Sequence, residues 1–356
     1  MFRDQPAQAL ALVRDRSFGS QKLRNIGGRP VLVSRPNSNS HGHSRGESIK
    51  IALAFVAIYL VWGSTYLAIR YAVETIPPLV TAGIRHTIAG GILLAWACLR
   101  GYRPRREHWV AGIVLGALFF LVGHGTLHWA EQHVASGLAA LLIATEPMFI
   151  LVLAWASGQQ RISRMSALGL AAGIVGVAIL TGAEVSSKDA SLIGLLAVLV
   201  GSLSWAAGVV ISPKLKLPTD ALARTAVPLV CGAVMLLTTA GLTGEFRGLR
   251  WSAVSLKSIF GLGYLIVFGS IVAFTAYTWL LQRCPPTLVA THTYANPVVA
   301  VLLGWLLASE PLTPRVAVAS VAILGAIVLI RRGERATRRR TVEAVPAAVE
   351  STEQCA

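Results

Sequence analysis

Three polar side chains recur at helical spacing at the end of an apolar stretch. His124, His128 and Glu131 occupy positions i, i+4 and i+7, which places them on one face of a helix. Imidazole and carboxyl groups bind and release protons, so this face is a candidate for proton transfer. In a bilayer a central charge costs about 2.5–3.5 kcal/mol, so the stripe must face protein or water. The alternative for Glu131 is a position at the water interface, where this cost falls.

A second candidate is Glu146, which directly precedes Pro147 deep inside another apolar stretch. A carboxyl group at that depth is a candidate for exchanging a proton near neutral pH. Proline removes a backbone hydrogen bond and kinks a helix, which frees a carbonyl group to face a cavity. The alternative is a buried salt bridge between Glu146 and Arg85 that serves only assembly, because charges inside a membrane tend to pair.

Arg85 and His86 interrupt a third apolar stretch. The guanidinium of Arg85 can bind a carboxylate through two hydrogen bonds, or it can pair with an acid of the chain. Small residues such as Gly90 and, in a later stretch, Gly169 and Gly173 favour close packing of helices rather than ligand binding.

The elements that carry these residues are predicted to be membrane helices. Of 356 residues, 54% are hydrophobic and 13% are charged, and the mean hydropathy is +0.63; soluble chains carry about 25% charged residues. The apolar residues fall in runs of about 20, the length that crosses a hydrocarbon core roughly 30 Å thick. Ten runs are readable, at about 51–73, 79–99, 109–130, 134–156, 165–183, 190–212, 222–242, 254–281, 287–308 and 314–331.

The net charge of +16 is concentrated beside these runs. Of the 32 Lys and Arg residues, 25 fall on the side of the termini and 6 on the opposite side, with Arg85 inside a run. Both termini are therefore predicted to be cytoplasmic, in the cytoplasmic (inner) membrane. A basic balance so placed does not predict nucleic-acid binding. Residues 1–48 are expected to be a disordered basic arm that contacts anionic lipid at most, and residues 333–356 a cytoplasmic tail.

The chain contains an internal repeat, in residues 49–184 and 188–332. A shift of 150 residues aligns five identical residues without a gap: Trp129 with Trp279, Gln132 with Gln282, Leu138 with Leu288, Ala140 with Ala290, and Pro147 with Pro297. Each copy holds five spans, and an odd number inverts the second copy in the membrane. The predicted fold is an all-α integral membrane protein with ten transmembrane helices in two inverted five-helix repeats. Inverted repeats are typical of secondary transporters, which bind their substrate where the copies meet.

Several chemistries lack their motifs. No Gly is followed by Lys, so a P-loop for ATP is absent from the sequence. Gly125 follows His124, so the metalloprotease pattern H-E-x-x-H fails, although His124 and His128 resemble half of a metal site. The four cysteines are too dispersed to predict a disulfide framework. We therefore expect no cofactor, no metal and no enzymatic activity.

Four stretches carry a resemblance to a known family: Leu60–Tyr66, Ala82–Gly90, Ala130-Glu131 with Ser136-Gly137, and Tyr294–Gly304 with Glu310. Over residues 50–332 the chain resembles the EamA-like exporter branch of the drug/metabolite transporter superfamily. The resemblance implies ten helices in two inverted repeats, a central pocket lined by spans 1–4 and 6–9, and spans 5 and 10 at the periphery. Members export amino acids, other small metabolites or toxic compounds, some in exchange for protons. His86, His124, Glu146 and Gln160 depart from the family's usual residues.

We expect a secondary active exporter of small metabolites, such as amino acids, with protons and membrane lipid as further partners. The expected pocket contains Trp62, Ser64, Arg85, His86, His124, His128, Glu146, Trp205, Tyr277, His292, Tyr294 and Asn296. Proton coupling is assigned to Glu146, His128 and Glu131, and helix kinks to Pro147 and Pro297. One alternative is a cationic drug or lipid-linked carrier, in which Arg85 is structural. The other, outside transport, is an intramembrane metalloenzyme built on His124 and His128.

Overall fold

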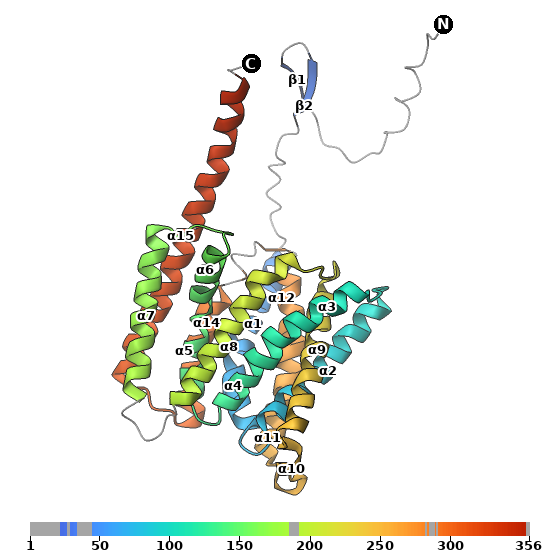
Figure 1. Ribbon diagram of the computed structural model, residues 1–356, viewed down its shortest axis with the longest axis vertical. Coiled ribbons are helices and arrows are strands. Elements are labelled where there is room, and N and C mark those ends of the chain that lie inside the picture. Colours follow the sequence, from blue (N-terminus) through green and yellow to red (C-terminus); the bar gives the residue numbers. More distant parts are fainter. Residues whose placement is uncertain are drawn as a thin grey trace. The chain divides into compact units, whose positions relative to one another are not determined.

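The computed structural model describes residues 22–26, 29–33, 45–184, 192–281, 283–284, 289 and 291–353 (Figure 1). The chain divides into two units, Met1–Ile49 and Lys50–Ala356. In the first unit, β1 (Lys22–Ile26) and β2 (Arg29–Val33) pair antiparallel, with Lys22 opposite Val33. This hairpin lies within the arm that we predicted to be disordered, and most of the rest of that arm lies outside the described residues.

The second unit is helical, as the sequence predicts. From the N-terminus its first elements are α1 (Arg45–Ala72), α2 (Pro78–Leu99), α3 (Arg106–Leu115), η1 (Gly116–His124), α4 (Gly125–Ala130), α5 (Ser136–Ile143), α6 (Glu146–Ala156) and α7 (Arg164–Glu184). They are followed by α8 (Leu192–Ile211), η2 (Ser212–Lys214), α9 (Ala221–Leu242), α10 (Glu245–Gly248), η3 (Trp251–Ala253), α11 (Leu256–Tyr264), η4 (Leu265–Val272), α12 (Ala273–Leu281), α14 (His292–Ala308) and α15 (Pro314–Glu353). Of these, η1 and η4 are π-helices, and η2 and η3 are 3₁₀-helices. Among the described residues, eight continuous helical segments are long and apolar enough to cross a membrane, and Arg164–Ile179 and His292–Ala308 are shorter apolar helices.

Local sequence explains where several helices begin. Pro78 and Pro314 occupy the first positions of α2 and α15, where the missing N–H costs no hydrogen bond. Asp220 caps α9 by accepting from the Ala223 N–H at 2.8 Å, and Ser255 caps α11 by accepting from Ser258 N–H at 3.1 Å. These caps satisfy backbone donors that a helix leaves free in its first turn.

The helices are interrupted at corresponding places in the two halves. The π-helix η1 lies between α3 and α4, and the π-helix η4 lies between α11 and α12. Their first residues, Gly116 and Leu265, are 149 positions apart, close to the repeat of 150 read from the sequence. The span that contains Glu146 breaks between α5 and α6, directly before Glu146 and Pro147, whereas Pro297 lies inside the continuous helix α14.

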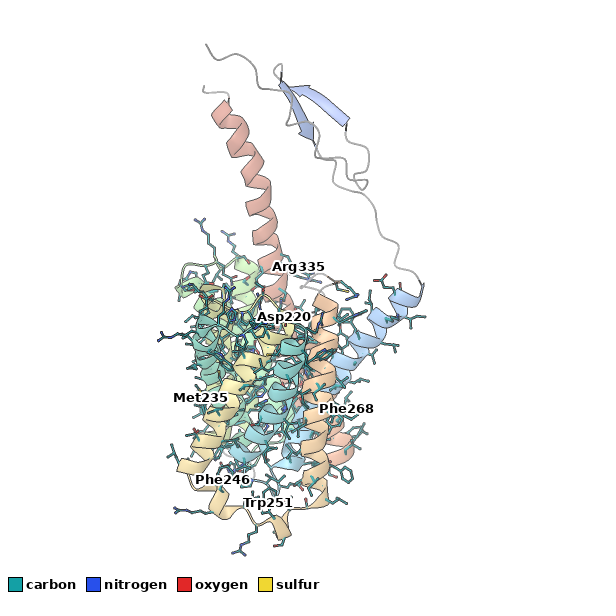
Figure 2. The ribbon with its side chains drawn as sticks, turned by 90° about the vertical axis from the view of Figure 1, so that its right-hand side faces the viewer. Asp220, Met235, Phe246, Trp251, Phe268 and Arg335 are labelled. Atoms are coloured by element: carbon teal, nitrogen blue, oxygen red, sulfur yellow. The ribbon has the colours of Figure 1, made fainter. Side chains whose placement is uncertain are left out.

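The bundle has two ends with different contacts. Figure 2 shows Phe246 and Trp251 at one end, and Asp220 and Arg335 toward the other. At the first, here called the distal end, α11 is joined to α1 by a hydrogen bond from Ser258 Oγ to Tyr71 O (2.6 Å). There α2 is joined to α10 by a hydrogen bond from Leu79 N–H to Glu245 Oε2 (2.9 Å). At the opposite, proximal end, Lys216 Nζ lies 3.1 Å from Glu107 Oε2.

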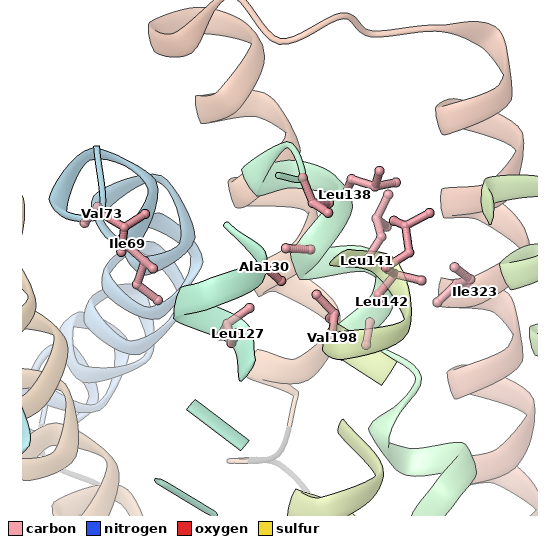
Figure 3. Packing of buried hydrophobic residues seen from close by; sticks show 14 of the residues in the cluster. Ile69, Val73, Leu127, Ala130, Leu138, Leu141, Leu142, Val198 and Ile323 are labelled. Atoms are coloured by element: carbon pink, nitrogen blue, oxygen red, sulfur yellow. The ribbon is translucent and has the colours of Figure 1, made fainter. Parts of the chain in front are cut away.

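The largest buried cluster is drawn from elements far apart in the sequence. Figure 3 shows Leu127 of α4, Leu141 of α5, Val198 of α8 and Ile323 of α15 within it. Close packing elsewhere depends on small residues, as the sequence predicts: a Cβ on Gly90 would lie 3.0 Å from Leu229 Cβ in α9. Other apolar side chains lie exposed on the outer surface of the helices, where lipid tails would cover them.

Glycine also sets the pairing of α7 with α15, which lie side by side (Figure 1). A Cβ on Gly169 would lie 2.8 Å from the carbonyl oxygen of Ala326, and one on Gly176 would lie 3.2 Å from the nitrogen of Ile323. The small-residue face of this span is therefore a packing surface.

Candidate functional site

Three histidines from the first half of the membrane unit meet a tryptophan from the second half. His86 Nε2 of α2 lies 2.9 Å from His124 Nδ1 at the end of η1, and His128 Nδ1 of α4 donates to the carbonyl oxygen of His124 at 2.7 Å. The indole of Trp205 in α8 stacks on His124, with ring centroids 5.4 Å apart and planes 12° apart. The rings of His124 and His128 lie with their centroids 6.0 Å apart, and His86 joins them from another helix.

Two ring nitrogens of this cluster have no hydrogen-bond partner among the described residues. They are Nδ1 of His86 and Nε2 of His128, both buried. Because a carbonyl oxygen only accepts, His128 must carry its proton on Nδ1 when it is neutral, which leaves Nε2 as a free acceptor. Buried polar atoms are normally satisfied, so these nitrogens are candidate contacts for a ligand or a water.

Arg85 connects the two halves of the chain. Its side chain is 4% exposed and its Nε donates to Ser270 Oγ of η4 at 3.1 Å. None of the described acidic side chains forms an ion pair with it. The salt bridge between Arg85 and Glu146 that the sequence left open is therefore absent among the described residues.

The π-helix η4 brings this arginine and α1 together. Gly269 accepts a hydrogen bond from Trp62 Nε1 at 3.1 Å through its carbonyl oxygen. A Cβ on Gly269 would lie 3.0 Å from Thr65 Cγ2 and 3.4 Å from Arg85 Nη2. Because glycine has no side chain, the side chains of Thr65 and Arg85 can both approach the backbone here. π-Helical segments are frequent at functional sites.

Aromatic rings surround Trp62 of α1. Its ring centroid lies 5.5 Å from Phe274, 5.2 Å from Tyr277 and 4.8 Å from His292. All four side chains are half-buried. Two residues further along α1, Ser64 Oγ lies 2.6 Å from the hydroxyl of Tyr264. The structure thus brings the predicted residues Trp62, Tyr277 and His292 into one cluster.

Glu146 opens α6, directly after the break in its span. It is half-buried and forms neither a hydrogen bond nor an ion pair with the described side chains. Tyr66, Tyr277 and Arg331 belong to its electrostatic surroundings. The carboxyl group therefore remains available to a proton or a ligand.

Two further predicted residues lie on α14. Asn296 has a buried Oδ1 without a partner among the described residues. Tyr294 packs against the largest apolar cluster, and Arg331 is a charged neighbour. Neither contacts the histidine cluster through any hydrogen bond or ring contact that the described residues show.

At the distal end, the carboxylate of Glu310 accepts four hydrogen bonds. Oε1 accepts from Arg70 Nη1 (2.9 Å) and from the N–H and Oγ of Ser136 (2.8 Å each), and Oε2 accepts from Gly137 N–H (3.0 Å). We call these four residues the Glu310 cluster. It caps α5 and ties it to α1 and to the connection between α14 and α15.

Glu131 lies beside this cluster rather than with His124. It is 2% exposed, and neither carboxyl oxygen has a partner among the described residues. Glu131, Arg70 and Glu310 all line one cavity of about 1010 Å³. Glu131 is therefore buried at the distal end of the bundle, just beyond α4, and its position relative to the water interface stays a prediction.

Sequence reasoning missed Arg70 and Ser270 as members of these sites. Ser270 is a polar residue within an apolar span, and Arg70 is a charge near the end of one. Polar and charged side chains inside a membrane are costly to insert, so both residues could have been selected as candidates on that ground. Their partners, however, lie 185 and 240 positions away.

Comparison with known proteins places this architecture in a family. A sequence model described as the EamA-like transporter family matches residues 49–182 and again residues 192–332. The inner membrane transporter YedA of Escherichia coli (strain K12) is 37% identical over 285 residues, which cover 79% of this chain and 90% of YedA. Protein PecM of Dickeya dadantii (strain 3937) is 27% identical over 286 residues, 80% of this chain and 93% of PecM.

A solved crystal structure shares the fold, with a TM-score of 0.54 and 20% identity over 81% of this chain and 98% of the other. Two consecutive family matches together cover nearly all of the second unit, and the membrane helices fit them. The chain therefore belongs to the EamA-like transporter family and is a multi-pass membrane transporter.

Proposed function

We propose that the protein is a secondary active exporter of small zwitterionic or anionic metabolites, such as amino acids, across the cytoplasmic membrane in exchange for protons. Arg85 carries this proposal. It is a buried guanidinium that reaches from the first family match to Ser270 in the second, and it has no acidic partner among the described side chains. Its remaining N–H groups suit a carboxylate, which two parallel hydrogen bonds would orient.

Alternating access would come from rocking of two inverted repeats. The tandem family matches and the matching positions of η1 and η4 support two equivalent halves. The break before Pro147 and the proline at position 297 offer places to bend. The excess of Lys and Arg on the side of the termini supports a cytoplasmic proximal end and an extracytoplasmic distal end.

Proton exchange is assigned to Glu146, with His128 and Glu131 as further carriers. The carboxyl group of Glu146 is half-buried and unpaired among the described side chains, and a proton-exchanging acid must reach water and lose its charge in turn. The free Nε2 of His128 can accept a proton.

The test is flux in proteoliposomes that hold the purified protein, with a panel of radiolabelled amino acids and other small metabolites, with and without a pH gradient. We expect flux of one compound to grow with the gradient. Glu146→Gln should abolish that growth, whereas the matched control Glu107→Gln, at the proximal surface, should retain it. Gradient-independent flux in the wild type would refute proton exchange, and loss of the gradient effect in both variants would refute the assignment to Glu146.

A cationic drug carrier is the second candidate, which the rings around Trp62 and the unpaired Glu146 favour, because aromatic faces and carboxylates bind cations. Competition separates the two. Cationic dyes should inhibit a cation carrier even in Arg85→Gln, whereas a carboxylate carrier should lose its substrate in that variant. We propose transport without enzymatic activity, which stoichiometric iron or zinc in the purified protein would contradict.

A further inference from the structure

The Glu310 cluster joins the two halves of the protein at the distal end. Arg70 and α5 belong to the first family match, and Glu310 belongs to the second. Both oxygens of Glu310 accept hydrogen bonds, and one of the donors is the guanidinium of Arg70. Charge-assisted hydrogen bonds of this kind are roughly twice as strong as neutral ones.

Close packing leaves the cluster no intermediate position. A Cβ on Gly304 of α14 would collide with the carboxyl group of Glu310, and one on Gly137 would lie 3.0 Å from the Cα of Val301. Helices α5 and α14 therefore touch backbone to backbone beside the carboxylate. A packed interface of this kind is either formed or separated.

The Glu310 cluster is formed and largely buried in this structure. Glu131, Ser136 and Glu310 are 2%, 0% and 8% exposed. Toward the proximal side, Glu146 and His292 are half-buried. A carrier whose distal contacts are shut must separate the Glu310 cluster before it can open on that side.

Glu131 introduces a second acid into the same cavity. Arg70 and Glu310 act on it electrostatically. Two carboxylates beside one guanidinium carry a net negative charge when both are ionised, and a buried, unpaired charge is costly. A neutral Glu131 is compatible with the closed arrangement, whereas an ionised one competes with Glu310 for Arg70. The other titratable or charged groups that line this cavity are Glu74, with its partner Lys257, His133 and Arg315.

We propose that Glu131 is the proton sensor of a distal gate formed by the Glu310 cluster. With Glu131 neutral, Arg70 and the N-terminus of α5 hold Glu310 and the distal end stays closed. Ionisation of Glu131 weakens the hold on Glu310, and the distal end opens. This sign suits proton exchange by an exporter, because the protonated carrier then closes toward the side from which the proton came. The inference rests on the proposed function only for the identity of the distal side.

The gate can be tested without a substrate, by spin-label distances in nanodiscs. The labels go on Gln132→Cys and Leu312→Cys, both exposed, in a chain whose four native cysteines are replaced. Between about pH 5 and about pH 9 we expect the ratio of long to short distances in the parent to rise by roughly 5–150-fold, the range typical of coupling between one site and a two-state element.

Three variants decide the assignment. In Glu131→Gln the distance between the two labels should stay short at every pH, and in Glu310→Gln it should be long at every pH. Glu245→Gln is the matched control, because Glu245 also caps a distal helix N-terminus, at Leu79 and Val80; it should respond to pH as the parent does. If Glu310→Gln does not fold, Ser136→Ala removes one donor and should raise the long fraction.

A parent response that survives in Glu131→Gln, or a distance that stays short in Glu310→Gln and Ser136→Ala, would overturn the proposal. Flux measurements separate this failure from failure of the proposed function. A pH-dependent distance without metabolite flux would leave the gate standing and refute the exporter; proton-driven flux with an unresponsive distance would do the reverse.

Discussion

The hydrogen bond between Arg85 and Ser270 should be measurable as a coupling between the two halves of the chain. Ser270→Ala removes the acceptor that Nε of Arg85 reaches at 3.1 Å. Since both side chains are buried, no bulk water replaces the lost hydroxyl. A hydrogen bond to a charged group contributes about 1.5–3 kcal/mol, against about 0.5–1.5 kcal/mol for a neutral one.

A double-mutant cycle isolates this contribution. The free energy of unfolding would be measured by SDS titration in mixed micelles for the wild type, Ser270→Ala, Arg85→Gln and the double variant. We expect a coupling energy of about 1.5–3 kcal/mol. Ser204→Ala is the matched control, because Ser204 Oγ donates to the neutral carbonyl of Leu118 at 2.8 Å; its cycle with Arg85→Gln should be additive within about 0.5 kcal/mol.

Additive effects of Ser270→Ala and Arg85→Gln on the free energy of unfolding would contradict this coupling. Arg85 would then be held by packing alone, and the link from η4 to α2 would have no energetic role. An equal coupling for Ser204→Ala would show instead that the cycle reports a general loosening of the bundle.

Two further predictions concern the scaffold. Gly176→Ile should destabilise the protein by about 1–3 kcal/mol, because its side chain would enter the contact with Ile323, whereas Gly325→Ile on α15, where a Cβ would have no neighbouring atom within 4 Å, should be near neutral in the same SDS titration. Asp220→Ala should cost about 0.5–2 kcal/mol through loss of the α9 cap, and Asp220→Ser should restore most of it; equal losses in both variants would contradict the capping role.

The helical architecture could be predicted from the sequence because the features that indicate a helix are close together in the chain. Runs of apolar residues and prolines such as Pro78 and Pro314 mark the helices, and helical spacing placed His124 beside His128. Sequence reasoning did not reach the partners of Arg85 and Glu310, since Ser270 and Arg70 come from the other half of the chain and depend on tertiary packing. Glu131 shares the spacing of the histidines, yet it lies just beyond α4, where the chain turns toward the distal cavity.

The π-helix η1 changes what a single span can contact. Hydrogen bonds from i to i+5 place more residues in each turn than the roughly 3.6 of an α-helix, so the side chains after η1 are rotated about the axis relative to those of an uninterrupted α-helix. In α3, a Cβ on Gly112 would meet Val227 of α9, whereas Gly123, near the end of η1, faces Trp205 of α8. The continuous helical segment that contains α3 and η1 thus contacts two neighbouring helices through differently directed surfaces. A single helical periodicity fitted along its whole length does not separate these two surfaces.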